Sequence, residues 1–356
     1  MSIITQIPRK IFSRIQLYYK IFKTDNETYY PEAERKSKFK QKLELIRDHM
    51  RHHEEEKYYY CYGMDRKGIS LKDYIDYPSF RKYRDSRNKT KPFNYICLLR
   101  DKDLFSIVGK HYGMPTLCTL GVLEMGTENN QIADILKEHK HLFLKPIDDL
   151  CGNGTMCIDE INGEITVNDK PTTTENLQKL FCSLKGDFLV QSRLIQHPDI
   201  SEIYPNSINT LRIVTVNPKH SSKTEDVILL TCMLRLGAHG SYVDNWAKGG
   251  LIVRVDENGH LDEYGFYKPG YGTRVKEHPD TRTVFKDRII PYYKEAISLA
   301  KQFHTKLKNI HSIGWDVSIT KDGPVFIEGN DNWELGFVQI CEGGIRAKVE
   351  KYFSKH

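Results

Sequence analysis

The chain has 356 residues, of which 39% are hydrophobic, and this length favours two domains or one large multi-lobed domain with a real core. No run approaches the roughly 18 consecutive apolar residues of a membrane span, and the N-terminus lacks the apolar region of a signal peptide, so we expect a cytoplasmic protein. The eight cysteines are scattered without a CxxC pair, which argues against a structural zinc site and favours reduced thiols.

The net charge of +6 is concentrated at the front, because residues 1–110 carry 25 Lys and Arg against 15 Asp and Glu. Residues 8–23 predict a basic amphipathic helix with one apolar stripe, formed by Ile11, Ile15, Tyr18 and Phe22. Such a helix either lies on an anionic membrane surface, as a peripheral contact at the inner membrane face, or docks on its own domain. We expect no nucleic-acid partner.

The next segments predict helices, and near residue 94 the sequence changes from polar and charged to segments with apolar runs. Residues 31–58 predict a charged helix, and Ser70 is expected to cap a short helix that begins at Leu71. Residues 95–99 predict a buried strand, followed by a helix to Gly113, an extended segment over 114–122 and a helix over 130–139. Residues 141–146 predict a strand that ends with Lys145 and Pro146.

A glycine-bearing turn follows that strand and contains Gly152, Asn153 and Gly154. Glycines let backbone N–H groups approach phosphate oxygens, and Lys145 on the adjacent strand would neutralise their charge. The pattern is not the phosphate loop G-x4-G-K-[ST], since the lysine comes first. An ordinary hairpin turn explains the glycines equally well.

Three apolar strands in the middle of the chain each carry or flank a cation or an amide. Residues 188–195 contain Gln191, the strand within 206–216 contains Arg212, and residues 227–235 end in Arg235. Asn245 and Lys248 then precede two glycines and a further strand. A charged residue in a buried strand needs a partner of opposite charge, so this convergence predicts one shared anionic site.

The last third predicts a loop-rich stretch over 255–290, a helix from Pro291 to about residue 309, and a hairpin over 313–330. Glu328 and Asn330 project from the same face of the second strand, and Asp316 lies on the neighbouring strand. Two carboxylates and an amide oxygen suit Mg²⁺, although solvated acidic residues at one end of a hairpin remain an alternative. A terminal helix is expected to end at Phe353.

Seven signals in this order resemble the ATP-grasp superfamily, and in particular its sugar-transfer-associated group, which is also linked to teichuronopeptide biosynthesis. The signals are Asp101-Lys102, Leu144-Lys145-Pro146 with the glycine loop, Leu189-Val190-Gln191, Asn209-Thr-Leu-Arg212, Asn245-x3-Gly249-Gly250, Gly314-Trp-Asp316 and Glu328-Gly-Asn330. The resemblance covers about residues 90–350, and the first 90 residues carry none of the signals.

The resemblance implies an α+β ATP-grasp fold, in which two α+β lobes grip ATP after a helical N-terminal region. The expected parts are a basic helical region over 1–90, a pre-ATP-grasp segment over 91–142, a small lobe with hinge over 143–200 and a C-terminal lobe with the metal site over 201–356. The implied cofactors are ATP and Mg²⁺.

The resemblance also assigns expected roles to residues of this sequence. The nucleotide contacts would be Lys102 and Lys145 at the phosphates, Gly152, Asn153 and Gly154 folded over them, and Val190 and Gln191 at the adenine. Many relatives carry Glu at the position of Gln191, which leaves base selectivity open. Mg²⁺ would be held by Asp316, Glu328 and Asn330, and the reacting phosphate would be faced by Arg212, Arg235, Asn245 and Lys248.

The function so implied is an ADP-forming carboxylate–amine ligase of surface polysaccharide or capsule biosynthesis. It would join an amine or amino acid to a sugar acid or to the carboxylate of a lipid-linked glycan. The alternatives are a kinase that phosphorylates a sugar or polyol hydroxyl, and a nucleotide-binding module without catalysis. Asp331, Glu334 and His278 are the candidates for a general base.

Overall fold

The computed structural model describes residues 9–24, 27–52, 58–88, 95–117, 119–124, 135–136, 138–147, 154–183 and 186–354. Contacts divide the chain into two compact units. The first comprises residues 1–83, 266–274 and 334–356, and the second comprises residues 84–265 and 275–333.

The first unit is helical. Its elements are α1 (Arg9–Lys23), α2 (Lys38–His52), the short 3-10 helix η2 (Leu71–Asp73), α10 (Leu335–Glu342) and α11 (Arg346–Phe353), together with the start of α3 (Tyr77–Asn88). The buried side chain of Gln339 on α10 exchanges two hydrogen bonds with the backbone of Ile75, at 2.9 and 3.1 Å. The C-terminal segment therefore packs on the N-terminal one, although about 260 residues separate them in sequence.

Two helix predictions in this unit need correction. The charged helix predicted over 31–58 is shorter, since α2 begins at Lys38 and ends at His52. The predicted terminal helix is two helices, α10 and α11, which Gly343 and Gly344 separate. Gly343 has φ +74°, and a Cβ on Gly344 would lie 2.4 Å from the carbonyl oxygen of Asp73, so the chain turns where only glycine fits. Ser70 caps η2 as predicted, by accepting a hydrogen bond from the N–H of Lys72.

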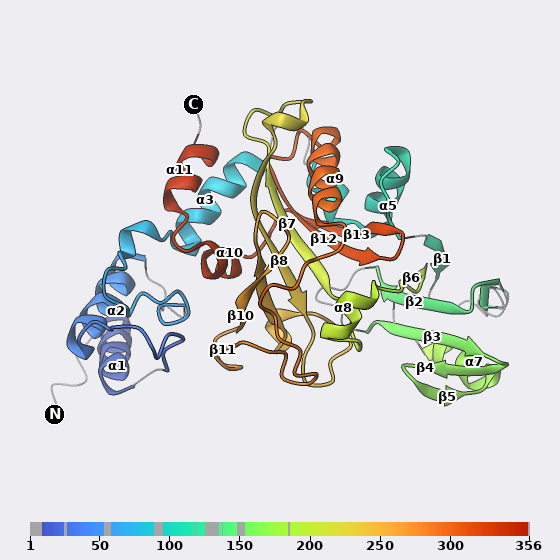
Figure 1. Ribbon diagram of the computed structural model, residues 1–356, viewed down its shortest axis with the longest axis horizontal. Coiled ribbons are helices and arrows are strands. Elements are labelled where there is room, and N and C mark those ends of the chain that lie inside the picture. The colour runs from blue at the N-terminus through green and yellow to red at the C-terminus, as the bar shows by residue number, and fades with distance from the viewer. Residues whose placement is uncertain are drawn as a thin grey trace. The chain divides into compact units, whose positions relative to one another are not determined.

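Apart from Phe266, Tyr267 and Arg274, the second unit contains the whole of a seven-stranded sheet with the strand order β11-β10-β9-β8-β7-β12-β13 (Figure 1). The strands are β7 (Thr210–Val216), β8 (Ile228–Leu236), β9 (Leu251–Val255), β10 (Leu261–Tyr267), β11 (Arg274–Val275), β12 (Ser312–Thr320) and β13 (Gly323–Asn330). Helix α9 (Tyr293–Lys306) packs against β7, β8, β12 and β13 through buried Ala296, Ala300 and Phe303, the inner face that the sequence predicts.

The same unit contains a six-stranded sheet with the order β1-β6-β2-β3-β4-β5. Its strands are β1 (Thr119–Leu123), β2 (His141–Pro146), β3 (Met156–Ile161), β4 (Glu164–Val167), β5 (Lys170–Thr172) and β6 (Phe188–Ser192). Leu177 and Phe181 of α7 (Thr174–Ser183) join Leu142, Leu144 and Val190 in one hydrophobic core, which therefore covers a single face of this sheet.

The strand predicted over 95–99 is wrong, because this segment forms the short helix α4 (Cys97–Arg100), which leads into α5 (Lys102–His111). A short apolar run is compatible with a buried strand and with a buried helix, because it is too short to show the periodicity of either. The carboxylate of Asp101, which follows α4, accepts the N–H groups of Asp103 and Leu104 and so caps α5. Leu99 is buried in either case.

Several other predicted helix and strand boundaries differ from those in the structure. The segment 255–290, predicted as loop-rich, contains β10 and β11, and the extended piece predicted over 114–122 becomes a strand at Thr119. The helix predicted over 130–139 lies mostly outside the described residues. The remaining short helices are α8 (Pro198–Ile203), η3 (Thr224–Asp226) and η4 (Trp246–Lys248). With two antiparallel sheets, covering helices and a helical N-terminal region, the predicted α+β class is confirmed.

Over the described part of the chain, no helix combines the length and the apolar character that a membrane crossing requires.

Candidate active site

Three charged residues lie opposite one another across neighbouring strands. Arg212 on β7 pairs with Asp316 on β12, and Asp316 pairs with Glu328 on β13. Directly opposed residues of antiparallel strands project from the same face, so these side chains form one row, which runs across strands that lie side by side in Figure 1. The predicted hairpin is confirmed, and the row places the two predicted carboxylates together.

Asp316 is the centre of this row. It is 3% exposed, and both of its carboxylate oxygens accept hydrogen bonds from arginine. Arg212 donates to them at 2.5 and 2.9 Å, and Arg235 donates at 2.8 Å. The buried arginines that the sequence assigns to an external anion therefore have an anion within the protein, as burial of a charge requires.

Asp244 belongs to the same network, and the sequence reasoning missed it. Its carboxylate accepts from Arg235 at 3.1 Å, and from the N–H and the hydroxyl of Thr210. The signal was present, because a second arginine at the end of an apolar strand favours a second acidic partner and Asp244 directly precedes Asn245. Arg235 is thus held between Asp244 and Asp316.

The two carboxyls of the hairpin differ in charge preference. Burial acts to raise the pKa of Asp316, but the nearby charges of Arg212 and Arg235 outweigh it and lower that pKa below its usual range. The pKa of Glu328 is raised, first by burial and then by the negative charge of Asp316. Asp316 therefore stays ionised while Glu328 favours its proton.

Asn330 completes the predicted metal-ligand set. Its amide donates to Glu328 at 3.2 Å and approaches Asp316 at 3.5 Å. Two carboxyls and an amide within hydrogen-bonding distance supply the hard oxygen atoms that Mg²⁺ prefers, so the side chains present fit this ion. Within the described residues no group of three or more His, Cys, Asp or Glu side chains suits a metal, so this set relies on the amide as its third donor.

One face of the six-stranded sheet carries the polar candidates. Lys145 on β2 lies opposite Leu189 on β6, and Phe143 lies opposite Gln191, so Lys145 and Gln191 share a face. Leu144 and Val190 point to the other face, into the core with α7. Val190 therefore offers only its backbone to the candidate site.

Lys145 has an unusual environment for a lysine. It is 8% exposed, and burial lowers its pKa to about 8, with Glu328 opposing and Lys102 reinforcing the shift. The influence of Glu328 links the face of the six-stranded sheet to the charged row on the seven-stranded sheet. Among the described residues, the attraction of Glu328 does not outweigh the effect of burial on this lysine, which suits a binding site for anionic oxygens.

Lys102, the first residue of α5, contacts the end of strand β2. Its ammonium group donates to the carbonyl of Pro146 at 2.8 Å and to that of Ile147 at 3.4 Å. Gly154 has φ +69°, and a Cβ there would meet the Pro146 ring at 3.2 Å. Both ends of the glycine turn are thus held beside Pro146, whereas Gly152 and Asn153 lie outside the described residues.

Gln191 is 3% exposed, and its Nε2 makes a long contact of 3.5 Å with the Thr119 hydroxyl. Its Oε1 is buried and has no hydrogen-bond partner among the described residues. An unsatisfied buried amide oxygen costs free energy, so it is suited to accept from a bound N–H donor such as the amino group of adenine.

The other predicted contacts are less central. The Asn245 side chain accepts from the N–H of Ala247 and caps η4, and Lys248 is exposed on that short helix. These two residues directly precede the strand that follows, β9.

All three general-base candidates are engaged in structural contacts. His278 is buried, with Nε2 2.8 Å from the Gly237 carbonyl and its ring stacked on Tyr204, and burial lowers its pKa. Asp331 forms a two-pronged ion pair with Arg100, with both distances 2.8 Å. Glu334 accepts from the N–H of Gly336 at the start of α10. These contacts give each of the three residues a structural role.

Solved structures of similar fold include ATP-grasp ligases. PsnB, complexed with minimal precursor, Mg and ADP, is 9% identical, with 76% of this chain and 62% of that chain covered and a TM-score of 0.38. D-alanine–D-alanine ligase from Bacillus anthracis is 12% identical, with coverages of 71% and 63% and a TM-score of 0.39. D-alanyl-alanine synthetase A from Vibrio cholerae O1 biovar eltor is 11% identical, with coverages of 73% and 66% and a TM-score of 0.38.

In each of these alignments the chain spans less than two thirds of the other protein's length. No curated protein matches the sequence. Residues 81–352 match the family described as sugar-transfer associated ATP-grasp, which confirms the resemblance and the fold that the seven sequence signals predict. Because that match extends over most of the chain, the protein belongs to the sugar-transfer associated ATP-grasp family.

Proposed function

We propose that the protein is an ATP- and Mg²⁺-dependent ligase that joins a carboxylate to an amine. The observation that supports this most is the row Arg212–Asp316–Glu328, with Lys145 close enough to Glu328 for the two charges to interact. Phosphoryl transfer needs positioning and charge neutralisation more than covalent help from the protein. This arrangement brings both cations and oxygen donors to one place.

The side chains divide this work between the two sheets. On the seven-stranded sheet, Asp316, Glu328 and Asn330 would hold Mg²⁺, which neutralises phosphate charge when it is bound. Asp316 accepts from two arginines, and a carboxylate has about four lone-pair directions, so capacity for a metal bond remains. On the six-stranded sheet, Lys145 would bind phosphate oxygens and Gln191 would accept from the adenine amino group.

The proposed reaction balances in two steps. A substrate carboxylate oxygen forms a bond to the γ-phosphorus of ATP, the bond from that phosphorus to the β–γ bridging oxygen breaks, and ADP leaves. An amine nitrogen then bonds to the acyl carbon, the bond from carbon to the phosphate oxygen breaks, and phosphate leaves with loss of one amine proton. Arg212 and Arg235 lie beside the metal-ligand candidates and would neutralise charge on the transferred phosphate.

For the substrate we propose a sugar acid or a glycan carboxylate, with an amino acid or amine as the second partner, in surface polysaccharide biosynthesis. The support is the family's association with sugar transfer. We also propose a cytoplasmic location. The six described cysteines are free thiols, which agrees with a reducing compartment.

ADP release from ATP and Mg²⁺ tests the reaction class. Purified protein is offered pooled sugar acids with and without pooled amines, and the Glu328→Gln variant is run beside it. ADP release that needs both pools, yields an amide and disappears in the variant supports the ligase. Release with the sugar pool alone, giving a phosphorylated product, would establish a kinase instead, and ATP binding without turnover on either pool would indicate a binding module.

Raising the pH from about 7 to about 10 is expected to weaken ATP binding by roughly tenfold, because Lys145 has a pKa of about 8 and loses its charge over this range. Bound phosphates favour the charged lysine, so the decline begins above that pKa and binding takes up a proton. Calorimetry in buffers of different ionisation enthalpy measures both effects. Lys145→Arg keeps its charge, and an equally steep decline in that variant would rule out Lys145 as the cause.

Gln191→Leu is expected to reduce the preference for ATP over GTP by about tenfold, because the unpartnered Oε1 is removed from the proposed adenine position. Leucine has a similar volume, so the buried β6 position stays filled. Competition binding of the two nucleotides measures the ratio. An unchanged ratio would show that Gln191 does not contact the base.

A further inference from the structure

Helix α2 buries a mainly polar side. Its four buried residues are Gln41, Lys42, Glu44 and Leu45, and only Leu45 is apolar. Glu44 accepts from Lys36 at 2.9 Å and from the Tyr59 hydroxyl at 2.6 Å. A helix on a protein surface normally buries its apolar side, so this orientation is reversed.

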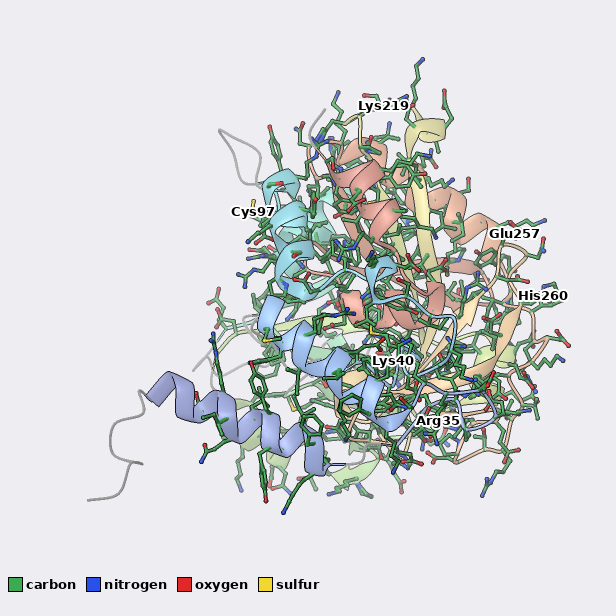
Figure 2. The ribbon with its side chains drawn as sticks, turned by 90° about the vertical axis from the view of Figure 1, so that its left-hand side faces the viewer. Arg35, Lys40, Cys97, Lys219, Glu257 and His260 are labelled. Atoms are coloured by element: carbon green, nitrogen blue, oxygen red, sulfur yellow. The ribbon has the colours of Figure 1, made fainter. Side chains whose placement is uncertain are left out.

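The apolar side of α2 is exposed instead. Phe39 is 65% exposed, Leu43 47% and Met50 55%, and their spacing of four and seven residues places them along one side of the helix. Lys40 and Arg47 are exposed on the same helix, and Figure 2 labels Lys40 near its N-terminal end. Together these side chains form a basic, apolar surface.

Helix α1 repeats the arrangement. The sequence predicts Ile15, Tyr18 and Phe22 as one apolar stripe, but the structure turns Leu17, Tyr18 and Ile21 inward and leaves Ile15 51%, Tyr19 60% and Phe22 49% exposed. Tyr18 meets His49 of α2 edge-on at 6.1 Å, so the two helices are in contact and lie side by side in both figures. Of the predicted stripe, Tyr18 is therefore half-buried, whereas Ile15 and Phe22 are exposed.

The net charge of this pair of helices is strongly positive. Each helix carries five Lys or Arg residues, whereas α1 has no acidic residue and α2 has only Glu44 and Asp48. About a third of the exposed large apolar side chains in the described residues lie on these two helices. Apolar and aromatic side chains interspersed with cations fit the boundary of an anionic bilayer, where rings lie at headgroup level and cations meet phosphates.

We infer that the exposed side of the α1–α2 pair is a docking surface for an anionic lipid membrane. The surface consists of Ile15, Tyr19, Phe22, Phe39, Leu43 and Met50, with Arg14, Lys23, Lys40 and Arg47 between and around them. A second copy of the chain would bring two positively charged faces together, which like-charge repulsion disfavours. The inference uses only the first unit and does not depend on the proposed reaction.

Vesicle sedimentation tests it with the full-length protein. Binding is expected to vesicles of phosphatidylcholine with about 30% phosphatidylglycerol, to weaken as salt rises, and to be at least about tenfold weaker to phosphatidylcholine alone. The Phe39→Ser/Leu43→Ser variant is expected to lose at least tenfold in partitioning, and Lys40→Glu/Arg47→Glu about tenfold on the anionic vesicles. Because all four side chains are exposed, the thermal midpoint should equal that of the wild type.

The matched control is Ile195→Ser/Ile289→Ser, which removes two exposed apolar side chains, 71% and 61% exposed, from elsewhere on the surface. It should bind vesicles like the wild type. Equal vesicle binding by the control and by Phe39→Ser/Leu43→Ser, or no binding of the wild type, would overturn the inference. A dimer in sedimentation velocity that Phe39→Ser/Leu43→Ser dissociates would assign the surface to a second copy instead.

Discussion

Glu328→Gln is expected to lower ADP formation by about 10²- to 10³-fold while the free energy of unfolding stays the same or rises. The loss of activity follows from removing a charged oxygen donor at the proposed metal site. Stability is spared because burial and Asp316 raise the pKa of Glu328, so its charged form is costly in the folded protein. When the pKa of an acid is higher in the folded than in the unfolded protein, the free energy of unfolding falls as the pH rises above the pKa of the unfolded state. Glutamine cannot ionise, so the variant does not lose stability in this way.

The measurements are ADP release at saturating Mg²⁺ and the urea unfolding midpoint. Glu257→Gln is the matched control, since Glu257 is an exposed glutamate in the turn between β9 and β10, labelled in Figure 2. It should leave both measurements unchanged. If Glu328→Gln instead unfolds much more easily than the wild type, the carboxylate is a structural charge, and its assignment to Mg²⁺ loses its support.

Asp316→Ala is expected to destabilise the protein by about 3–5 kcal/mol, because the buried Arg212 and the partly buried Arg235 lose the carboxylate that both of them contact. For a unit of this size that loss corresponds to a thermal midpoint about 10 °C lower. ADP formation should vanish as well, but the loss of activity alone would then be uninformative. Differential scanning calorimetry of the ligand-free protein measures the stability change.

A second-site variant separates the two causes. Arg212→Met in the Asp316→Ala background removes one uncompensated charge and keeps an apolar side chain of similar length, so it is expected to restore part of the midpoint without restoring activity. A midpoint for Asp316→Ala equal to that of the wild type would show that water or Arg235 with Asp244 satisfies the cluster without Asp316. Because of this confounding effect, Glu328→Gln is the better test of the metal site.

The site hairpin was predictable because its information is local. Alternation over 313–330 and the turn at Lys321–Pro324 specify two strands, and the period of two then places Glu328 and Asn330 on one side. The strand that carries Lys145 was predictable in the same way, with the bounds that the structure shows. Segment 95–99 was not, since a five-residue apolar run is compatible with either a strand or a helix.

The ion-pair partners of Arg212 and Arg235 could not be predicted from the sequence. The sequence indicated that Arg212 and Arg235 need an anion, but only the pairing of β7 with β12 showed that Asp316 supplies it and that Asp244 shares it. Similarly, periodicity predicted an apolar stripe on α1 and could not say which way that stripe faces, and for the segment of α2 the sequence indicated only a charged helix. Helix orientation depends on contacts such as Glu44 with Tyr59, which no local pattern contains.

The sequence by itself determined the family, the order of the strands that bear the motifs, and the residue types gathered at the candidate site. These follow from local alternation, turn chemistry and motif order, which act over a few residues at a time. Only the tertiary structure decided which charges neutralise one another, which amide oxygen of a buried strand is left unpaired, and which helix faces stay in solvent. Each of those outcomes depends on burial and on partners about 15 to more than 100 residues away in the chain, for which the local sequence carries no record.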